Sequence, residues 1–325
     1  MNGYRLRLSA ATIRRLALAS VAVNVLLVVT GGAVRLTGSG LGCPTWPRCT
    51  EASYHNTAAY GIHGYVEFGN RMLTFAVGIV VVATFLAAVL AQHRRRSVIW
   101  LAVANGATIP AQAVIGGITV LSHLNPWTVA AHFLFTVLII AVSFALWWRT
   151  REGDEPARAE VSPPLRTLIA LLSAVTVLVL AAGTVTTGSG PHAGDAHARR
   201  TGLAPGSVAQ LHTDLVMLLV GLSVATWFAL RAAQSPHRLQ RAALWLVGIE
   251  LAQGAIGFVQ YFTHLPVLLV GLHMTGAAAV WIAALVLLFR TRDRGPVPAA
   301  QPDNAVSDRT ATHVPAGIAR EPRPT

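Results

Sequence analysis

Three histidines lie inside long apolar runs, where a polar side chain is costly unless it is paired or ligating. They are His132, His212 and His273, and each lies a few residues into its run. His212 precedes His273 by 61 residues, whereas the position that precedes His132 by 62 residues is Asn70. Two imidazoles at equal depth on facing helices can ligate a metal centre, and the alternative is a hydrogen bond between helices.

The residues around His273 favour haem over zinc. The segment GLHMTGAAAV contains Gly271, Gly276 and three alanines, which leave room for a large flat group. Imidazole is a standard axial ligand of haem iron, whereas zinc needs three or four clustered ligands. We therefore predict that His212 and His273 are the axial ligands of a haem iron.

A second polar group lies near His132, in the segment HGYVEFGNR. Its members His63, Glu67, Asn70 and Arg71 are spaced three or four residues apart, which places them on one helical face. One interpretation is an intrahelical ion pair between Glu67 and Arg71 at the lipid headgroups. The interpretation that we favour pairs Arg71 with a haem propionate and assigns Glu67 to acid/base catalysis, because the second half has no acid at the equivalent position.

These side chains must be positioned by helices that cross a membrane. The chain of 325 residues is 54% hydrophobic and only 12% charged, and its charges separate apolar runs long enough to cross a bilayer. We predict eight transmembrane helices, within 16–34, 72–92, 97–121, 126–148, 167–190, 208–230, 242–262 and 266–289.

The net charge of +12 reflects topology rather than nucleic-acid binding, because the arginines gather at alternate ends of the runs. This pattern predicts a multi-pass protein of the cell membrane with both termini in the cytoplasm. The first run is too long for a cleavable signal peptide. The first outer loop, 35–61, then holds Cys43 and Cys49 in an oxidising compartment, where a disulfide is favoured over a metal-binding pair.

The chain also contains an internal repeat. GAVRLTGSG at 32–40 matches GTVTTGSG at 183–190, and QAVIGG and QGAIGF each precede a histidine at the same interval. We therefore predict two four-helix bundles, 16–148 and 167–290, related by a pseudo-twofold axis along the membrane normal. A cytoplasmic N-terminus (1–15), a cytoplasmic linker (149–166) and a disordered cytoplasmic tail (291–325) complete the predicted organisation.

These motifs together resemble the haem A synthase family. The resemblance covers residues 15–290 and rests on GGAVRLTGSGLGCPTWPRC, on VEFGNR and on the three histidines. The composition is most similar to that of actinobacterial members.

The resemblance implies haem b in the second bundle and haem O as the substrate in the first. The C8 methyl group of haem O is oxidised to a formyl group with water-derived oxygen, which gives haem A for cytochrome c oxidase. The substrate site implied by the family comprises Arg35, His63, Asn70, Arg71 and His132. This chain departs from the family's Glu-x-x-His-Arg pattern at Asn70, so His132 alone or His63 is expected to bind the iron there.

The implied partners are haem O synthase (protohaem IX farnesyltransferase), the assembly of cytochrome c oxidase, and the lipid bilayer. A copper requirement, homo-oligomer formation and the electron acceptor are left open by the sequence. Two other classes remain alternatives: a non-catalytic bis-histidine cytochrome that carries electrons from quinol, and a transporter with parallel repeats.

Overall fold

The structure of the protein is a computed structural model that describes residues 8–297. Residues 1–7 of the predicted N-terminus and 298–325 of the predicted tail lie outside the described residues. The described part contains eight α-helices: α1 (Ala10–Leu36), α2 (Gly61–Val89), α3 (Arg96–Leu121), α4 (Pro126–Arg149), α5 (Pro163–Ser189), α6 (Pro205–Ala232), α7 (His237–Phe262) and α8 (Val267–Phe289). Each is long and apolar enough to cross a membrane. The prediction of an all-α multi-pass membrane protein is confirmed.

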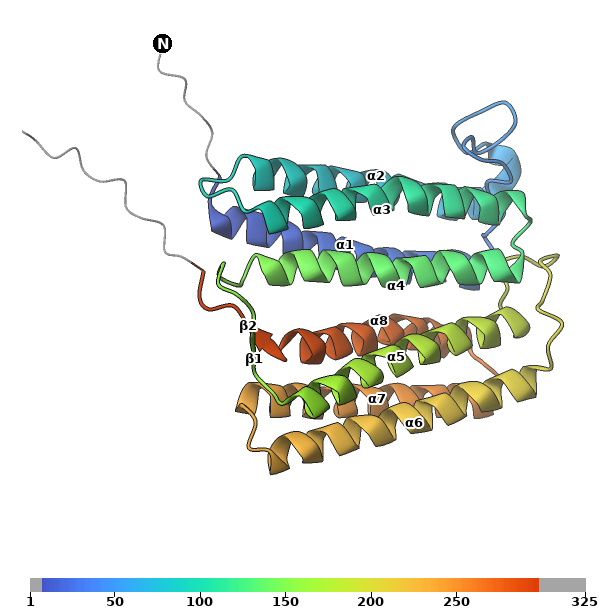
Figure 1. Cartoon of the computed structure of the whole chain (residues 1–325). Helices are drawn as coiled ribbons and strands as arrows, with labels where there is room; N and C mark the ends of the chain where they lie inside the picture. The colour runs from blue at the N-terminus through green and yellow to red at the C-terminus, as the bar shows by residue number, and fades with distance from the viewer. Residues whose placement is uncertain (1–7, 298–325) are drawn as a thin grey trace, which may run out of the picture.

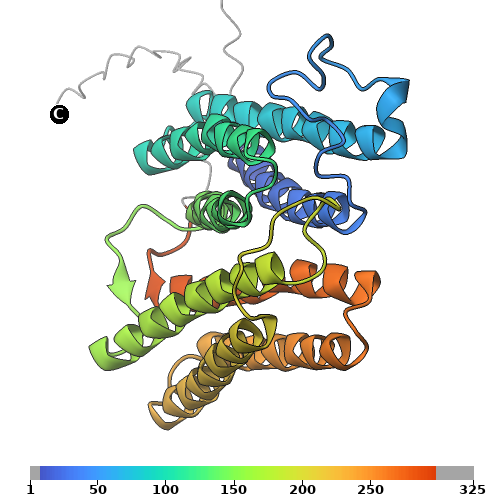
Figure 2. The same ribbon diagram turned by 90° about the vertical axis from the view of Figure 1, so that its right-hand side faces the viewer.

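The helices form two groups of four that lie one above the other, α1–α4 and α5–α8 (Figure 1). Within the stack, α2 and α3 lie at one edge and α6 and α7 at the other (Figure 2). The groups meet where α1 and α4 contact α8 and where α4 contacts α5. The pseudo-twofold relation and the bundle boundaries stay predictions.

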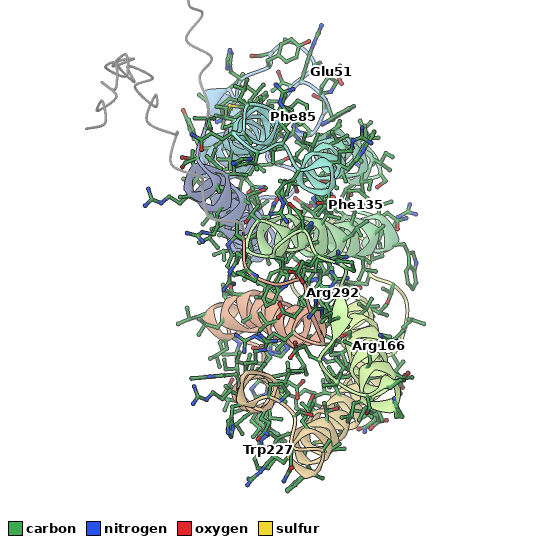
Figure 3. The ribbon with its side chains drawn as sticks, turned by 60° about the vertical axis from the view of Figure 1, so that its left-hand side comes forward. Glu51, Phe85, Phe135, Arg166, Trp227 and Arg292 are labelled. Carbon is green, nitrogen blue, oxygen red and sulfur yellow. A yellow bond between two sulfur atoms is a disulfide. The ribbon has the colours of Figure 1, made fainter. Side chains whose placement is uncertain are left out.

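Helix formation pairs the backbone N–H and C=O groups within each segment, as the apolar phase of a membrane requires. The side chains then face either the lipid or the interior of the bundle. Large apolar side chains such as Phe75, Trp100 and Phe258 are exposed at the surface of the bundle. Polar side chains pair inside it, where Asn105 Nδ2 donates to Ser20 Oγ at 2.9 Å. Figure 3 labels Phe85 on α2 and Trp227 on α6, toward opposite edges of the stack.

Aromatic side chains form part of the interface between the groups. Phe144 of α4 is fully buried, and its ring lies edge-on to Phe289 of α8 with centroids 5.4 Å apart. Trp281 Nε1 of α8 donates to the carbonyl oxygen of Val137 of α4 at 2.9 Å. A buried indole with its N–H satisfied joins the two groups firmly.

All the connections that join α1 to α2, α3 to α4, α5 to α6 and α7 to α8 lie at one end of the bundle, which we call the disulfide end (Figure 1). A short 3-10 helix, Ala58–Tyr60, leads into α2 there. The first and last described residues lie at the other end, the terminal end. Helix α2 begins at Gly61, well before the run predicted from Met72, because the Glu67–Arg71 ion pair is accommodated inside the helix.

The terminal end is more ordered than the sequence predicted. Strand β1 (Arg158–Ala159) pairs antiparallel with β2 (Arg292–Asp293), so disorder predicted from residue 291 is wrong for the start of that segment. Nearby, Asp154 Oδ1 accepts from Arg95 at 2.8 Å and from Arg149 at 2.7 Å. Backbone pairing and these ion pairs hold the linker against the helix ends.

Candidate functional site

A cavity of about 1010 Å³ occupies the interior, and residues of all eight described helices contribute to its mainly apolar lining. His132, His212 and His273 all line it. Helices α4, α6 and α8 each begin at the disulfide end, and each histidine lies within the first turns of its helix. The three imidazoles therefore lie at similar depth, toward the disulfide end.

His212 and His273 lie opposite each other in the second half of the chain. Their ring centroids are 6.4 Å apart and the ring planes are inclined by 80°. An iron bound at about 2 Å by one nitrogen of each ring requires centroids about 6 Å apart, because the ring radius adds to each bond length. The pair fits an iron centre with two imidazole ligands. The Nδ1 atom of each ring has no hydrogen-bond partner among the described residues.

Each of the three imidazoles packs directly against a glycine of a neighbouring helix, which we call its glycine seat. The pairs, with the distance from a Cβ built on the glycine to Cε1 of the histidine, are Gly116 with His132 (2.9 Å), Gly183 with His212 (3.2 Å) and Gly257 with His273 (3.0 Å). Any side chain at these positions would press on the imidazole. These seats were not predicted from the sequence, although the repeated segments QAVIGG and QGAIGF contain two of them.

Two glutamines fasten the histidine helices beside these seats. Gln112 Nε2 donates to the carbonyl oxygen of His132 at 3.1 Å and to Thr136 Oγ1 at 2.7 Å. Gln253 Nε2 makes the equivalent bond to the carbonyl oxygen of His273 at 2.5 Å. Each glutamine lies one turn before its glycine seat, so the repeat places a tether and a seat on the same helix face.

The donor set does not suit a zinc ion. Across residues 8–297, no group of three or more His, Cys, Asp or Glu side chains is assembled that could hold a metal ion. A structural or catalytic zinc site needs at least three protein ligands. Two imidazoles in an apolar cavity are the ligand set of a haem iron instead.

The first half of the chain places His132 in the cavity together with Asn70, whose Oδ1 accepts a hydrogen bond from Thr30 Oγ1 at 2.7 Å. His63 is exposed, shares a hydrogen bond of 2.9 Å with Ser39 and is not part of the cavity lining. The structure therefore does not bring His63 to the iron position that we considered for it. His55, which the sequence did not single out, does line the cavity.

Glu67 and Arg71 line the cavity, and their side chains bind the first outer loop. Glu67 Oε2 accepts from the backbone N–H of Cys43 at 2.7 Å, and Oε1 accepts from Arg71. Arg71 also donates to the carbonyl oxygens of Cys43, Thr45 and Arg48. These bonds use all five guanidinium N–H groups, so none remains for a propionate. The ion pair weighed from the sequence is present, and pairing of Arg71 with a propionate is not supported.

The loop is closed by the predicted disulfide between Cys43 and Cys49. Both cysteines are buried. Between them, the Trp46 indole lies over Gly117 of α3, where a Cβ would come within 2.5 Å of Trp46 Cδ2. Trp46 also lines the cavity, so the loop covers the first-half part of it. This role of Trp46 was not predicted, because nothing in the local sequence indicates which helix the indole contacts.

Arg35 at the end of α1 links the two halves. Its Nε donates to the carbonyl oxygen of His192 at 2.6 Å and its second terminal nitrogen donates to Thr187 at 3.0 Å. Arg35 also lines the cavity. Guanidinium donors beside an apolar cavity suit a carboxylate ligand.

Comparison with known proteins places this site in a family context. A family model described as "Cytochrome oxidase assembly protein" matches residues 14–197. Heme A synthase of Geobacillus thermodenitrificans is 31% identical over 139 residues, which is 42% of this chain and 42% of that protein. Heme A synthase of Caulobacter sp. (strain K31) is 28% identical over 319 residues, covering 82% of this chain and 92% of that protein. Protoheme IX farnesyltransferase of Thermus thermophilus (strain ATCC BAA-163) is 27% identical over 294 residues, covering 84% of this chain and 47% of that protein. The matched regions thus span less than half of the Geobacillus and Thermus proteins.

Proposed function

Because this chain belongs to the cytochrome oxidase assembly protein family, we propose that it is a haem A synthase that oxidises the C8 methyl group of haem O to a formyl group. The observation that carries the proposal is the pair of imidazoles at a centroid distance of 6.4 Å, beside a cavity that extends into the first half. Three relatives that carry the name Heme A synthase support it.

In this proposal His212 and His273 hold a haem b in the second half. The glycine seats let the imidazoles lie close to the neighbouring helices, and Gln253 holds the helix of His273 in place. When bound, haem b supplies a one-electron acceptor. His212 and His273 would hold that iron between them and leave no place on it for oxygen species, so in this proposal the second half serves electron transfer.

The first half binds haem O through His132 in the same proposal. Arg35 donates one hydrogen bond to His192 in the outer loop of the second half and one to Thr187 in the last turn of α5. Arg35 lines the cavity and has N–H groups left after these two bonds, so it pairs with a propionate. Trp46 covers the site and limits the access of water. Glu67 and Arg71 hold the loop that carries Trp46, so in this proposal they act through the position of that loop.

The topology in this proposal follows the positive-inside pattern of the sequence. The disulfide end faces the outside of the cell membrane, and both termini are cytoplasmic. This orientation places the buried Cys43–Cys49 disulfide in an oxidising compartment. The bundles 16–148 and 167–290 are the substrate and haem b units.

Haem farnesylation is the reaction that must supply the substrate. A region similar to most of this chain forms about half of a Thermus protein named Protoheme IX farnesyltransferase. Joining a region like this chain to a haem farnesyltransferase in one polypeptide would pass a poorly soluble haem directly between the two parts. This arrangement supports haem O synthase as a partner of the chain.

The test is mass spectrometry of haems extracted from cells that express the full chain together with a haem O synthase. Haem A is expected in these cells and haem O in cells that carry the His132→Ala variant. Bound haem b without any haem A would instead indicate the non-catalytic cytochrome. Protein purified without haem would contradict both functions.

A further inference from the structure

Two acidic side chains line the cavity within the described residues, Glu67 and Glu250. Glu67 is committed to Arg71 and to the Cys43 N–H. Glu250 of α7 is only 4% exposed, and its Oε2 has no hydrogen-bond partner in the described part of the chain. It is therefore a buried acid that the proposed haem ligation does not use.

The surroundings of Glu250 are polar but carry no counter-charge. Ser223 Oγ of α6 donates to Glu250 Oε1 at 2.8 Å. Thr226 lies about one turn further toward the terminal end of α6, and its fully buried hydroxyl has no partner among the described residues. Burying an isolated carboxylate in apolar surroundings costs free energy. This group is therefore either protonated or stabilised by a positive charge nearby.

The ionisable groups on the helices packed against α7 do not supply that charge. Helix α6 contributes His212, Asp214 and Arg231, and α8 contributes His273. Asp214 is exposed and accepts from Gln210, and Arg231 lies at the terminal end over the Trp227 ring. The two histidines are those that we assign to iron.

Glu250 shares a helix face with the residues that hold His273. It precedes Gln253 by three residues and Gly257 by seven, and all three positions lie on one side of α7. Gly257 is the glycine seat of His273. Seven residues correspond to about 10 Å along the axis of α7. Glu250 therefore lies roughly two turns from the seat of His273, toward the terminal end.

We propose that Glu250 is the proton acceptor coupled to electron uptake by the second-half haem. The inference rests on the proposed function. With iron(III) and two neutral imidazoles, the iron and the porphyrin ring of a bound haem, leaving its propionates aside, would carry one positive charge, which would stabilise the Glu250 carboxylate across a low-dielectric cavity. Uptake of one electron by the bound haem would cancel that charge. One proton would then bind the carboxylate, so both charges are neutralised together.

This coupling requires the carboxyl group and not its hydrogen bond. Glu250→Gln keeps the size of the side chain and removes the titrating group. Ser223→Ala removes the hydrogen bond and keeps the carboxyl group. Asp214→Asn is the matched control, because it exchanges an acid for its amide at an exposed position of α6.

The experiment is a potentiometric titration of the resident haem in the purified full-length protein between pH 5.5 and 9, without substrate. The midpoint potential of the wild type should fall as pH rises, because a higher pH removes the proton that reduction requires. One proton per electron corresponds to a tenfold change per pH unit, or about 59 mV. Asp214→Asn should show the same dependence of midpoint potential on pH as the wild type. Ser223→Ala should keep the slope of that dependence but shift the pH range over which it occurs. Glu250→Gln should give a midpoint potential that does not change with pH.

A pH-independent potential in the wild type, or an unchanged slope in Glu250→Gln, would overturn the inference. If Glu250→Gln does not retain haem, a flat profile in Ser223→Ala would also overturn it, because the carboxyl group is still present. The proposed function is tested separately by haem A formation, since the titration involves no turnover. If the wild-type protein binds haem but makes no haem A, the proposed function is wrong. The titration would still decide whether Glu250 binds a proton when the haem is reduced.

Discussion

The glycine seat of His273 gives a prediction whose size follows from the structure. In Gly257→Ala, the added Cβ would lie 3.0 Å from Cε1 and 3.5 Å from Nδ1 of the imidazole. Ordinary contacts between carbon atoms are about 3.5–4.0 Å, so the ring must move by about 0.5 Å. Metal ligands keep their distances within about 0.2 Å, and the displacement exceeds that tolerance.

The expected result is partial loss of the second axial ligand. Forcing a methyl group into a tight contact costs about 1–3 kcal/mol. If this cost falls on the iron–imidazole bond, ligation weakens by about 5- to 150-fold. Absorption and electron paramagnetic resonance spectra of the purified variant should show the low-spin haem signal replaced by a high-spin signal, while haem remains bound through His212.

The matched control is Gly248→Ala on the same helix. A Cβ at Gly248 has no atom within 4 Å, and the position is exposed. Both substitutions favour the helix by about 1 kcal/mol, so a spectral change in Gly257→Ala alone cannot come from helix destabilisation. A wild-type low-spin spectrum in Gly257→Ala would refute the reasoning, because the His273 imidazole would then accommodate the added methyl group without losing the iron.

Three further predictions test other parts of the site. Thiol labelling of denatured, unreduced protein should find no free thiol at Cys43 or Cys49, and two labelled thiols would contradict the disulfide. His212→Ala should abolish the low-spin signal, and a signal that persists would remove His212 from the ligand set. Glu67→Gln weakens the ion pair with Arg71 by removing one charge, so haem O should accumulate while the low-spin signal of the second half stays at its wild-type level. Haem A formation at the wild-type rate in that variant would show that the first outer loop keeps its position without the Glu67–Arg71 ion pair.

Several features of this protein are determined by contiguous residues and were predicted from the sequence. Apolar runs separated by arginine clusters predict the eight spans, because crossing a bilayer depends on local length and hydropathy. The repeated interval from glutamine to histidine predicts equal depth for His132 and His273, since helix rise per residue is constant. The short Cys-x5-Cys interval in an outer loop predicts the disulfide.

Other features depend on how the helices rotate and pack, which local sequence does not encode. Glu67 and Arg71 have the spacing of an ion pair, but only the path of the loop shows that they bind Cys43 and fill the donors of the guanidinium. His63 lies on the same face by spacing, yet it lies outside the cavity.

The remaining contacts join residues far apart in the chain. Trp46 of the first outer loop packs against Gly117 of α3, and Ser223 of α6 donates a hydrogen bond to Glu250 of α7. Each of these contacts depends on the relative rotation of whole helices, which is set by the summed packing of many side chains. Sequence periodicity therefore predicted the helices and the depth of the histidines, while tertiary packing alone decided which polar groups are satisfied and which, like Glu250, are left with an unpaired oxygen.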